Sequence, residues 1–446
     1  MTRVPGRWVA IALLGLAAGA PALAQGGRPA LEGPADHVRY TIRKGDTLYD
    51  LAERYFVRLE DYRAVQRLNH IADPYRIPIG RVITVPMRLV RIEPLAARLI
   101  AARGTVRVQV EARDLPVRVG MPIAIGTRLE TGENGFLTIA LPNGSRTTLP
   151  TRSALVVRQL RRIPLIDAVD YDLEVAAGKV ETEATPINPG KGDLRVRTPR
   201  AVSAVRGTRF RVGYAEERSS TEVLVGAVAV GTAGGRRGDA GTQITGGFGA
   251  YVATDGTVAS EALLPPVALI EPGKVQTEDA VTLALAPVPT AQAYHVQIGA
   301  DAGFVDMMAE QMVTEPMARF TDIPNGNWFV RATAISATGL EGLYQSYAMK
   351  RSLATLEASA QGDLALMRFR WSGAGEGRRA YRFQMAGDDP AALPIVDEGG
   401  LGEEGLEMRD LKPGTYHWRV GLRQYSDGEM IEKWLPFEKL IVAPGH

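Results

Sequence analysis

Hydrophobic and polar residues alternate with two different periods between residues 38 and 90. Val38 to Arg43 alternates as a half-buried strand does, whereas Thr47 to Phe56 carries its apolar residues at helical spacing. Glu60 to Leu68 repeats the helical spacing, and Arg81 to Val85 alternates again. This order predicts a compact unit of strand, helix, helix and strand.

The pattern changes in residues 91–265, where short apolar runs are separated by Gly, Pro and Asn-Gly. These runs predict the strands Thr105–Val110, Phe136–Leu141, Ala154–Leu160, Leu194–Thr198, Thr208–Val212 and Thr221–Val230. Asn143-Gly144 is the strongest hairpin signal among them, because both residue types tolerate positive φ. The segment is therefore predicted to be an all-β domain.

Residues 266–446 contain an internal repeat. The repeated segments are Ala293–Ile298 with Ala380–Met385, and Asn325–Arg331 with Pro413–Arg419. Two copies built from alternating strands, at 266–350 and 351–446, suit a pair of small β-sandwiches. The alternative is a coincidental similarity between two β-rich segments. With this repeat, the expected fold is a mainly β, multidomain protein with one small β-α-α-β module.

The first residues have the pattern of a secretory signal. Arg3 and Arg7 are positive, Trp8 to Ala20 is apolar, and Ala22-Leu23-Ala24 has the small-x-small pattern of a cleavage site. We therefore expect a signal peptide at 1–24 that is cleaved after Ala24, a linker at 25–37, and a periplasmic protein. An uncleaved anchor is the alternative.

Net charge and cysteine content exclude several classes of function. The formal charge of +2 falls to zero when the two arginines of the signal segment are removed. A neutral chain gives no reason to expect nucleic acid as a partner. The absence of cysteine excludes disulfides, thiolate ligands, a thiol nucleophile and lipid attachment at a cysteine.

The stretch Tyr40 to Leu48, Y-T-I-R-K-G-D-T-L, carries the most specific motif. Gly45 allows a tight turn out of the first strand, and Asp46 or Thr47 can cap the following helix. The motif resembles the opening of the LysM family, whose pattern continues as far as Pro86. That family folds as β-α-α-β, and the resemblance implies binding of N-acetylglucosamine-containing glycans, chiefly peptidoglycan.

The resemblance also nominates a glycan groove between two loops. One wall is expected at Gly45, Asp46, Thr47 and Leu48, and the other is formed or supported by Asn69, Ile71, Asp73, Pro74 and Ile77. Asp46 has an alternative role as a helix cap alone, and Tyr49 is expected to pack rather than to contact ligand. Phe56 departs from the glycine that is frequent in the family, which bears on affinity more than on fold.

A second resemblance, to the FecR family, covers residues 100–230. It rests on Gly104–Val106, Gly126–Gly132, Leu141–Ser145, Ala177–Val180, Val196–Pro199, Val205–Phe210 and Val223–Val230. Regulators of that family carry a cytoplasmic segment and a membrane helix before this domain, whereas here a LysM-like module stands on that side. The regulatory role is therefore not carried over, and a periplasmic β domain for protein or ligand recognition is expected. Arg206 is expected to brace a turn rather than to act as a functional charge.

The C-terminal repeats resemble fibronectin type III-like domains, through their Tyr-x-x-Gln and Gly-x-Tyr/Trp strands. Trp328, Trp371, Trp418 and Trp434 are expected in their cores, with an aromatic carbohydrate platform as the alternative.

Catalytic signatures are absent from the sequence. The histidines form no zinc motif, no serine lies in G-x-S-x-G, and no phosphate-binding or dinucleotide fingerprint occurs. We therefore expect a non-enzymatic protein, without cofactor or metal, that binds peptidoglycan and presents β domains to an envelope protein or ligand. A periplasmic sensor or regulatory partner and an unrecognised wall-active enzyme are the alternatives.

Overall fold

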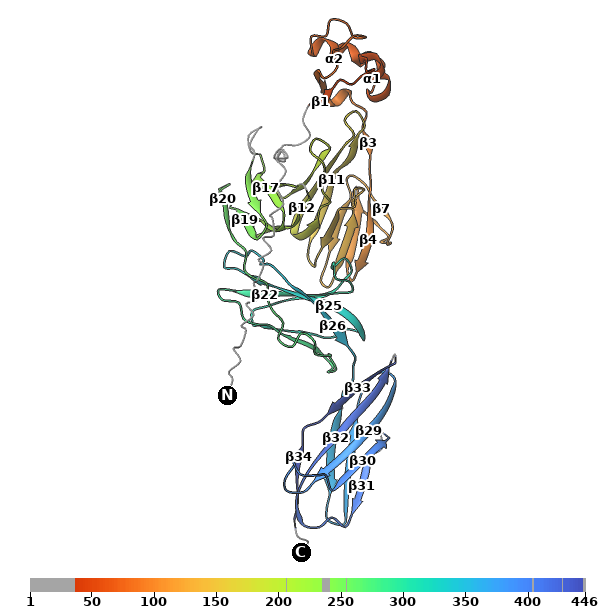
Figure 1. The fold of residues 1–446 in the computed structure, drawn as a ribbon, viewed down its shortest axis with the longest axis vertical. Helices are drawn as coiled ribbons and strands as arrows, with labels where there is room; N and C mark the ends of the chain where they lie inside the picture. The colour runs from red at the N-terminus through yellow and green to blue at the C-terminus, as the bar shows by residue number, and fades with distance from the viewer. Residues whose placement is uncertain are drawn as a thin grey trace, which may run out of the picture.

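The computed structural model describes residues 37–205, 207–234, 241–253, 255–402, 405–426 and 428–443. Over these residues the protein is mainly β, and its modules follow one another along a single long axis (Figure 1). The predicted fold class is thus confirmed. The expected signal peptide at 1–24 and residue 206 lie outside the described residues, as does the expected linker except His37, which is the first residue of a strand.

The N-terminal module has the predicted order of elements. β1 (His37–Thr41) pairs antiparallel with β2 (Val82–Pro86), and α1 (Leu48–Tyr55), η1 (Leu59–Asp61) and α2 (Tyr62–Leu68) lie between them in sequence. Apolar residues of both strands and both helices form one core, because the strand alternation and the helical spacing each direct one face inward. A single turn, η2 (Met87–Leu89), leads out of the module.

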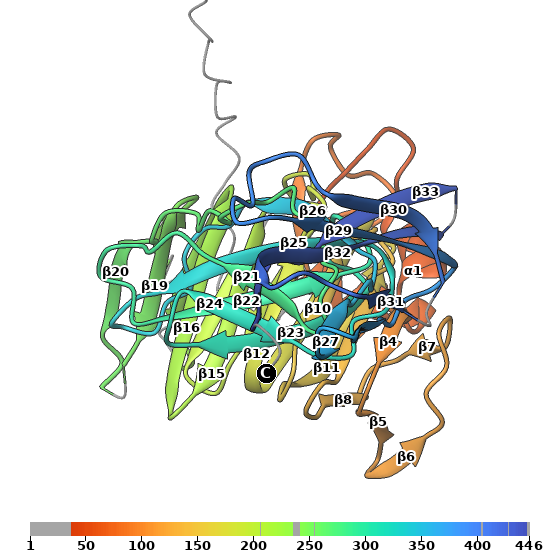
Figure 2. The same ribbon diagram turned by 90° about the horizontal axis from the view of Figure 1, so that it is seen from below.

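The central domain is a closed barrel of strands in which two sheets pack against each other. The strands are β3 (Glu93–Pro94), β4 (Ala97–Arg103), β5 (Val106–Val110), β6 (Arg113–Leu115), β7 (Pro122–Ile123), β8 (Arg128–Thr131), β9 (Phe136–Ala140), β10 (Arg146–Leu149), β11 (Ala154–Ile163), β12 (Ala168–Glu183), β13 (Gly192–Arg197), β14 (Ala201–Val205), β15 (Arg209–Ala215), β16 (Arg218–Val225), β17 (Ala227–Thr232), β18 (Thr242–Thr245), β19 (Phe248–Val252) and β20 (Val258–Ala262). Viewed along the long axis, the β5–β6 hairpin projects from the side of the domain (Figure 2).

The long strand β12 belongs to both sheets. Its first half pairs with β11 and, in parallel, with β13, in a sheet that continues through β14, β17 and β18. Its second half pairs with β10 and β15, in a sheet that continues through β16, β19 and β20. Apolar side chains from the facing sides of both sheets form one hydrophobic core.

The run predicted as one strand at Thr221–Val230 is two strands, and this prediction was wrong. Gly226 lies between β16 and β17 with a φ of +90°, a conformation that favours glycine. A Cβ at this position would lie 2.5 Å from Cγ2 of Thr208. The chain therefore turns at Gly226, and the two strands enter different sheets.

The Asn143-Gly144 signal does mark the turn between β9 and β10, which pair antiparallel. Gly144 has a φ of +86°, but Asn143 does not adopt positive φ. Instead, Oδ1 of Asn143 accepts a hydrogen bond of 3.1 Å from the Ser145 amide. The side-chain oxygen of Asn143 thus serves as an acceptor inside a longer turn.

Two sandwiches complete the chain. The first has β21 (Val281–Ala284), β22 (Ala293–Gly299), β23 (Met307–Val313), β24 (Met317–Phe320), β25 (Gly326–Ile335) and β26 (Ser346–Arg351). The second has β27 (Glu357–Gly362), β28 (Leu366–Ser372), β29 (Arg378–Ala386), β30 (Val396–Leu401), β31 (Leu406–Arg409), β32 (Gly414–Ser426), β33 (Glu429–Trp434) and β34 (Glu438–Val442). β22 and β25 run across the long axis in Figure 1, whereas β29 and β32 run along it.

The internal repeat corresponds to equivalent strand pairs. β22 pairs with β25 in the first sandwich, and β29 pairs with β32 in the second. Nε of Arg331 donates to Oε1 of Gln297 at 2.7 Å, and Nε of Arg419 donates to Oε1 of Gln384 at 2.8 Å. The same cross-strand bond therefore occurs in both copies.

Candidate functional site

Two loops of the N-terminal module meet at the position where the glycan groove was predicted. The amide of Leu48 donates a hydrogen bond of 2.8 Å to the carbonyl oxygen of Pro74. Leu48 begins α1, and Pro74 lies in the loop between α2 and β2. The fold thus places the two nominated walls side by side.

The first wall is stabilised by two side chains with separate tasks. Oγ1 of Thr47 accepts a 3.0 Å bond from the Asp50 amide, so Thr47 is the cap of α1. Oδ2 of Asp46 instead accepts from the Tyr40 hydroxyl at 2.8 Å and from the Arg43 amide at 2.7 Å. Asp46 therefore closes the turn and does not cap the helix.

Tyr40 links this turn to the core of the module. Burial and the hydrogen bond to the Asp46 carboxylate raise the pKa of Tyr40 to about 12. The phenol consequently stays protonated and keeps donating to Asp46. Gly45, at the tip of the same turn, has a φ of +90° and is exposed.

The second wall contains one structural side chain and one exposed turn. Nδ2 of Asn69 donates to the carbonyl oxygens of Val65 at 2.8 Å and Thr84 at 2.7 Å, and its Oδ1 accepts from the Thr84 amide at 2.7 Å. Asn69 thereby joins the end of α2 to β2. Asp73 is exposed, and its Oδ1 accepts from the Tyr75 amide at 2.9 Å.

The nine nominated residues fall into two groups by position. The side chains of Leu48, Ile71 and Ile77 are buried in the core of the module, and Asn69 is bonded to backbone. These four residues support the loops from below. The nominated residues that reach the surface are Gly45, Asp46, Thr47, Asp73 and Pro74.

Two residues beside this site were not predicted. Tyr49 and Tyr75 are stacked, with ring centroids 6.4 Å apart and planes at 27°. Their exposed fractions are 36% and 60%, and Tyr49 packs against the rings of Tyr62 and Tyr75 at the surface of the domain. No local pattern relates the two residues, because they meet only through the folding of the two loops.

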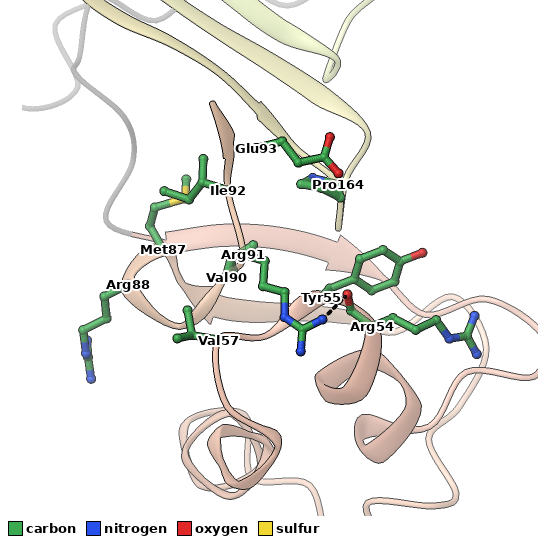
Figure 3. A pocket seen from close by; sticks show the side chains of 10 residues that line it. All are labelled: Arg54, Tyr55, Val57, Met87, Arg88, Val90, Arg91, Ile92, Glu93 and Pro164. Carbon is green, nitrogen blue, oxygen red and sulfur yellow. Dashed lines mark hydrogen bonds between the residues drawn. The ribbon is translucent and has the colours of Figure 1, made fainter. Parts of the chain in front are cut away.

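A groove of about 820 Å³ lies at the other end of α1, where the module meets the central domain. It is lined by Arg54, Tyr55, Val57, Met87, Arg88, Val90, Arg91, Ile92, Glu93 and Pro164. In Figure 3, Arg54 and Arg88 point outward on opposite sides, while Nη1 of Arg91 donates to the Arg54 carbonyl at 3.4 Å. None of the nominated glycan residues lines this groove.

Comparison with family models assigns two parts of the chain. The model of the LysM domain matches residues 40–86, and the model of the FecR protein matches residues 127–229. The chain contains a LysM domain and a FecR domain. Both predicted resemblances are therefore confirmed. A search among curated proteins finds no match.

Solved structures with partial likeness include a putative anti-sigma factor from Parabacteroides distasonis, at 18% identity and a TM-score of 0.24. That match covers 30% of this chain and 59% of the other. A segment of two fibronectin type III domains from chicken tenascin matches 39% of this chain and 99% of its own length, at 12% identity and a TM-score of 0.19. Fibronectin(III)-like modules of Clostridium thermocellum CbhA match 40% of this chain and 94% of theirs, at 11% identity and a TM-score of 0.18.

The LysM domain shares its core with the FecR domain. Ile163 and Leu165, at the tip of the β11–β12 hairpin, are buried within the hydrophobic cluster of the LysM domain. β3 follows the LysM domain directly and pairs with β11. These contacts fix the orientation of the LysM domain on the hairpin.

A cluster of charged side chains joins the FecR domain to the first sandwich. The FecR domain contributes Lys179, Glu181, Arg211 and Glu222, and the sandwich contributes His295, Glu310, Arg331 and Glu341. Arg331 forms two hydrogen bonds with Glu181, at 3.1 and 2.8 Å. The backbone takes part as well, since the Thr151 amide donates to Glu310 at 2.8 Å.

The charges of this cluster compensate one another. Burial alone would raise the pKa of Glu181, but the guanidinium groups of Arg331 and Arg211 outweigh it and lower the pKa to about 2. Burial alone would lower the pKa of His295, but the carboxylates of Glu341 and Glu310 raise the pKa to about 9. The cluster is therefore a set of mutually neutralised charges in the domain interface.

Neither a membrane span nor a metal site is found in the part of the chain that the structure describes. Its helices are too short and too polar to cross a bilayer. Its His, Asp and Glu side chains form no group that could hold a metal ion.

Proposed function

We propose that this protein is exported to the periplasm and binds the N-acetylglucosamine-containing glycan of peptidoglycan through its LysM domain. The observation that carries the proposal is the match of residues 40–86 to the LysM family, together with the contact between Leu48 and Pro74 that joins the two loops. Export is supported by the signal pattern of residues 1–24.

The surface of these loops has the chemistry that an acetamido sugar requires. An acetamido group offers one donor, one acceptor and a methyl group. Asp46, Thr47 and Asp73 supply polar atoms, the exposed Gly45 leaves backbone accessible, and Pro74 adds apolar surface. A shallow site of this kind binds weakly alone, and several contacts along a polymer compensate through avidity.

The remaining domains support a non-enzymatic role. LysM, FecR and fibronectin type III-like domains are typically non-catalytic. We therefore propose that the LysM domain positions the protein at the wall, and that the FecR domain and the sandwiches form a surface for an envelope protein or ligand. No cofactor is required for this role.

Cosedimentation with purified sacculi tests the proposal. The full protein is expected in the pellet, and a variant that lacks residues 38–90 is expected in the supernatant. That deletion exposes Ile163 and Leu165 to water and could unfold the rest of the chain. The circular dichroism spectrum of the deletion variant must therefore show that its β domains are still folded. A full-length protein that stays in the supernatant would contradict the proposal.

A regulatory role is the second candidate, and the match of residues 127–229 to the FecR family favours it. In this case the FecR domain would act as a periplasmic sensor or as the partner of a regulator. Transcript profiles of a deletion strain distinguish the candidates. A change confined to one regulated set of genes, restored by a variant lacking residues 38–90, would support regulation over wall attachment.

A further inference from the structure

The groove between the LysM domain and the FecR domain has a floor that backbone pairing holds in place. The Val57 amide donates to the Leu89 carbonyl oxygen at 2.9 Å. The Arg91 amide donates to the Tyr55 carbonyl oxygen at 2.7 Å. From the FecR domain, Pro164 of the β11–β12 hairpin lines the groove. The groove is therefore formed by the fold before any ligand arrives, which lowers the ordering cost of binding.

Three arginines line this groove without an acidic partner. Within the part of the chain that the structure describes, Arg54, Arg88 and Arg91 are exposed and form no ion pair. The acidic residue of the lining, Glu93, pairs instead with Arg162 of β11 at 3.4 Å. The groove therefore carries an excess of positive charge.

The surrounding domain has the same sign of charge. Residues 37–90 contain ten arginines and lysines against six aspartates and glutamates, although the chain without its signal segment is neutral. A guanidinium group binds a carboxylate through two parallel hydrogen bonds, which makes arginine the residue best suited to such a ligand. The charge of the groove is thus complementary to a ligand that carries carboxylates.

The directions of the three side chains indicate the form of this ligand. Arg54 and Arg88 point outward on opposite sides of the groove, and Arg91 lies between them (Figure 3). One small anion does not contact all three, whereas an extended ligand with several carboxylates does. Val57 and Ile92 add apolar surface, with 54% and 42% of their own surfaces exposed. An acidic peptide with small apolar side chains matches this combination.

Helix α1 connects the groove to the proposed glycan site. Leu48 begins α1 beside the two glycan loops, and Tyr55 ends it in the groove. The eight residues of α1 span about 12 Å at the usual rise of an α-helix. In peptidoglycan, a short peptide stem with several carboxylates branches from alternate sugars, and a stem of four residues spans about 13 Å when extended. A stem on a glycan held by the loops therefore reaches the groove.

We propose that this groove binds the peptide stem of peptidoglycan, with Arg54, Arg88 and Arg91 contacting its carboxylates. The inference rests on the proposed glycan binding and extends it from the sugar chain to the peptide. The stem should increase the affinity, and this gain should decrease as salt screens the exposed charges. The affinity for the uncharged sugar chitopentaose should not depend on salt.

Isothermal titration calorimetry of the full protein tests the stem site with two peptidoglycan tetrasaccharides. One carries tetrapeptide stems, and an amidase has removed the stems from the other. The wild type is expected to bind the first about fivefold more tightly, as two or three exposed ion pairs would provide. R54Q/R88Q should bind both alike. The matched control R39Q/R67Q removes the same charge from exposed arginines outside the groove and should keep the preference.

The outcomes separate the stem site from the proposed function. If the wild type binds both tetrasaccharides equally, the stem site is wrong while glycan binding stands. If the wild type binds neither tetrasaccharide nor chitopentaose, the proposed function fails and the stem site with it. Equal loss of the preference in R39Q/R67Q would show a general effect of charge and overturn the assignment to the groove.

Competition with free peptides tests the identity of the ligand in the wild type, and it also decides if R54Q/R88Q does not fold. The free tetrapeptide is expected to abolish the preference for the tetrasaccharide with stems and to leave the affinity for chitopentaose unchanged. A preference that persists in excess tetrapeptide would contradict the stem site. If an unrelated glutamate-rich peptide competes as well as the tetrapeptide, the groove is a general site for acidic peptides and the assignment to stems is wrong.

Discussion

Arg331 of the first sandwich holds Glu181 of the FecR domain by two hydrogen bonds, at 3.1 and 2.8 Å, across the boundary between the domains. The guanidinium group also lies 4.3 Å from the ring centroid of Phe304 and 4.4 Å from that of Tyr344. Arg331 is 4% exposed, so the pair is largely removed from water. The FecR domain and the first sandwich are therefore joined as one unit.

Replacing Arg331 by Gln should destabilise this unit by about 3 kcal/mol, because the Glu181 carboxylate, whose side chain is only 17% exposed, loses its closest partner. Hydrogen exchange in β12 and β25 measures the effect. The matched control is Arg419→Gln in the second sandwich, which loses the same bond to a glutamine and should cost about 1 kcal/mol. Equal effects of the two substitutions would contradict a special role for the Glu181 pair.

The pH dependence of this unit follows from its shifted groups. His295 has a pKa of about 9 in the folded protein and 6.5 in the unfolded chain. Its contribution to the free energy of unfolding is therefore complete below pH 6.5 and is lost as the pH rises to 9. Glu181 and Glu310 have a pKa of about 2 against 4.5, so their contributions are complete above pH 4.5 and are lost as the pH falls toward 2. Stability should therefore be highest between pH 4.5 and 6.5.

Calorimetric melting temperatures across pH 2–10 test this expectation. His295→Gln should remove the decline in melting temperature between pH 6.5 and 9, because Gln carries no titrating proton. The decline in melting temperature below pH 4.5 should remain. A wild-type melting temperature that stays constant from pH 6.5 to 9 would show that His295 is not stabilised by Glu310 and Glu341.

The LysM domain should be coupled to the FecR hairpin through Leu165. Leu165→Ala is expected to cost about 3 kcal/mol, because the side chain is buried in the LysM core. Faster hydrogen exchange in β1 and α1, in the other domain, is the diagnostic result. Leu393, with 91% of its surface exposed, supplies the control, since Leu393→Ala should change exchange very little. Unchanged exchange in β1 and α1 for Leu165→Ala would mean that the two domains are not coupled.

Gly226→Ala and Gly120→Ala separate backbone strain from steric overlap. The two glycines have φ values of +90° and +91°, but a Cβ at Gly226 would lie 2.5 Å from Thr208, whereas a Cβ at Gly120 meets nothing within 4 Å. Strain alone should cost about 1 kcal/mol at each position. Chemical denaturation should show a clearly larger loss at Gly226, and equal losses would refute the overlap.

Much of the fold could be predicted because its signals are local. Neighbours in sequence determine the strand and helix periods of residues 38–90 and the motif around Gly45. The same holds for the repeated strand segments, which contain Gln297 and Arg331 in the first copy and Gln384 and Arg419 in the second. The break at Gly226 was missed because apolar residues continue on both sides of it. The φ of +90° and the pairing of β16 and β17 in different sheets show the turn.

The site was harder to predict because its parts meet only in the fold. Asn69 is a polar residue of the kind that often contacts a ligand, yet its side-chain amide donates hydrogen bonds to the backbone oxygens of Val65 and Thr84. Tyr49 and Tyr75 are separated in sequence and carry no shared pattern. The partners Glu181 and Arg331 belong to different domains, so neither residue's neighbours in sequence indicate the pair.

Glycan binding by the LysM domain is tested most directly by competition in the sacculus assay. The full protein is bound to purified sacculi, and increasing amounts of chitopentaose or cellopentaose are added before sedimentation. Cellopentaose is the matched control, because it has the same β-linked backbone without acetamido groups. We predict that chitopentaose releases the protein into the supernatant and that cellopentaose leaves it in the pellet. A protein that never enters the pellet, or that both sugars release equally, would contradict recognition of N-acetylglucosamine.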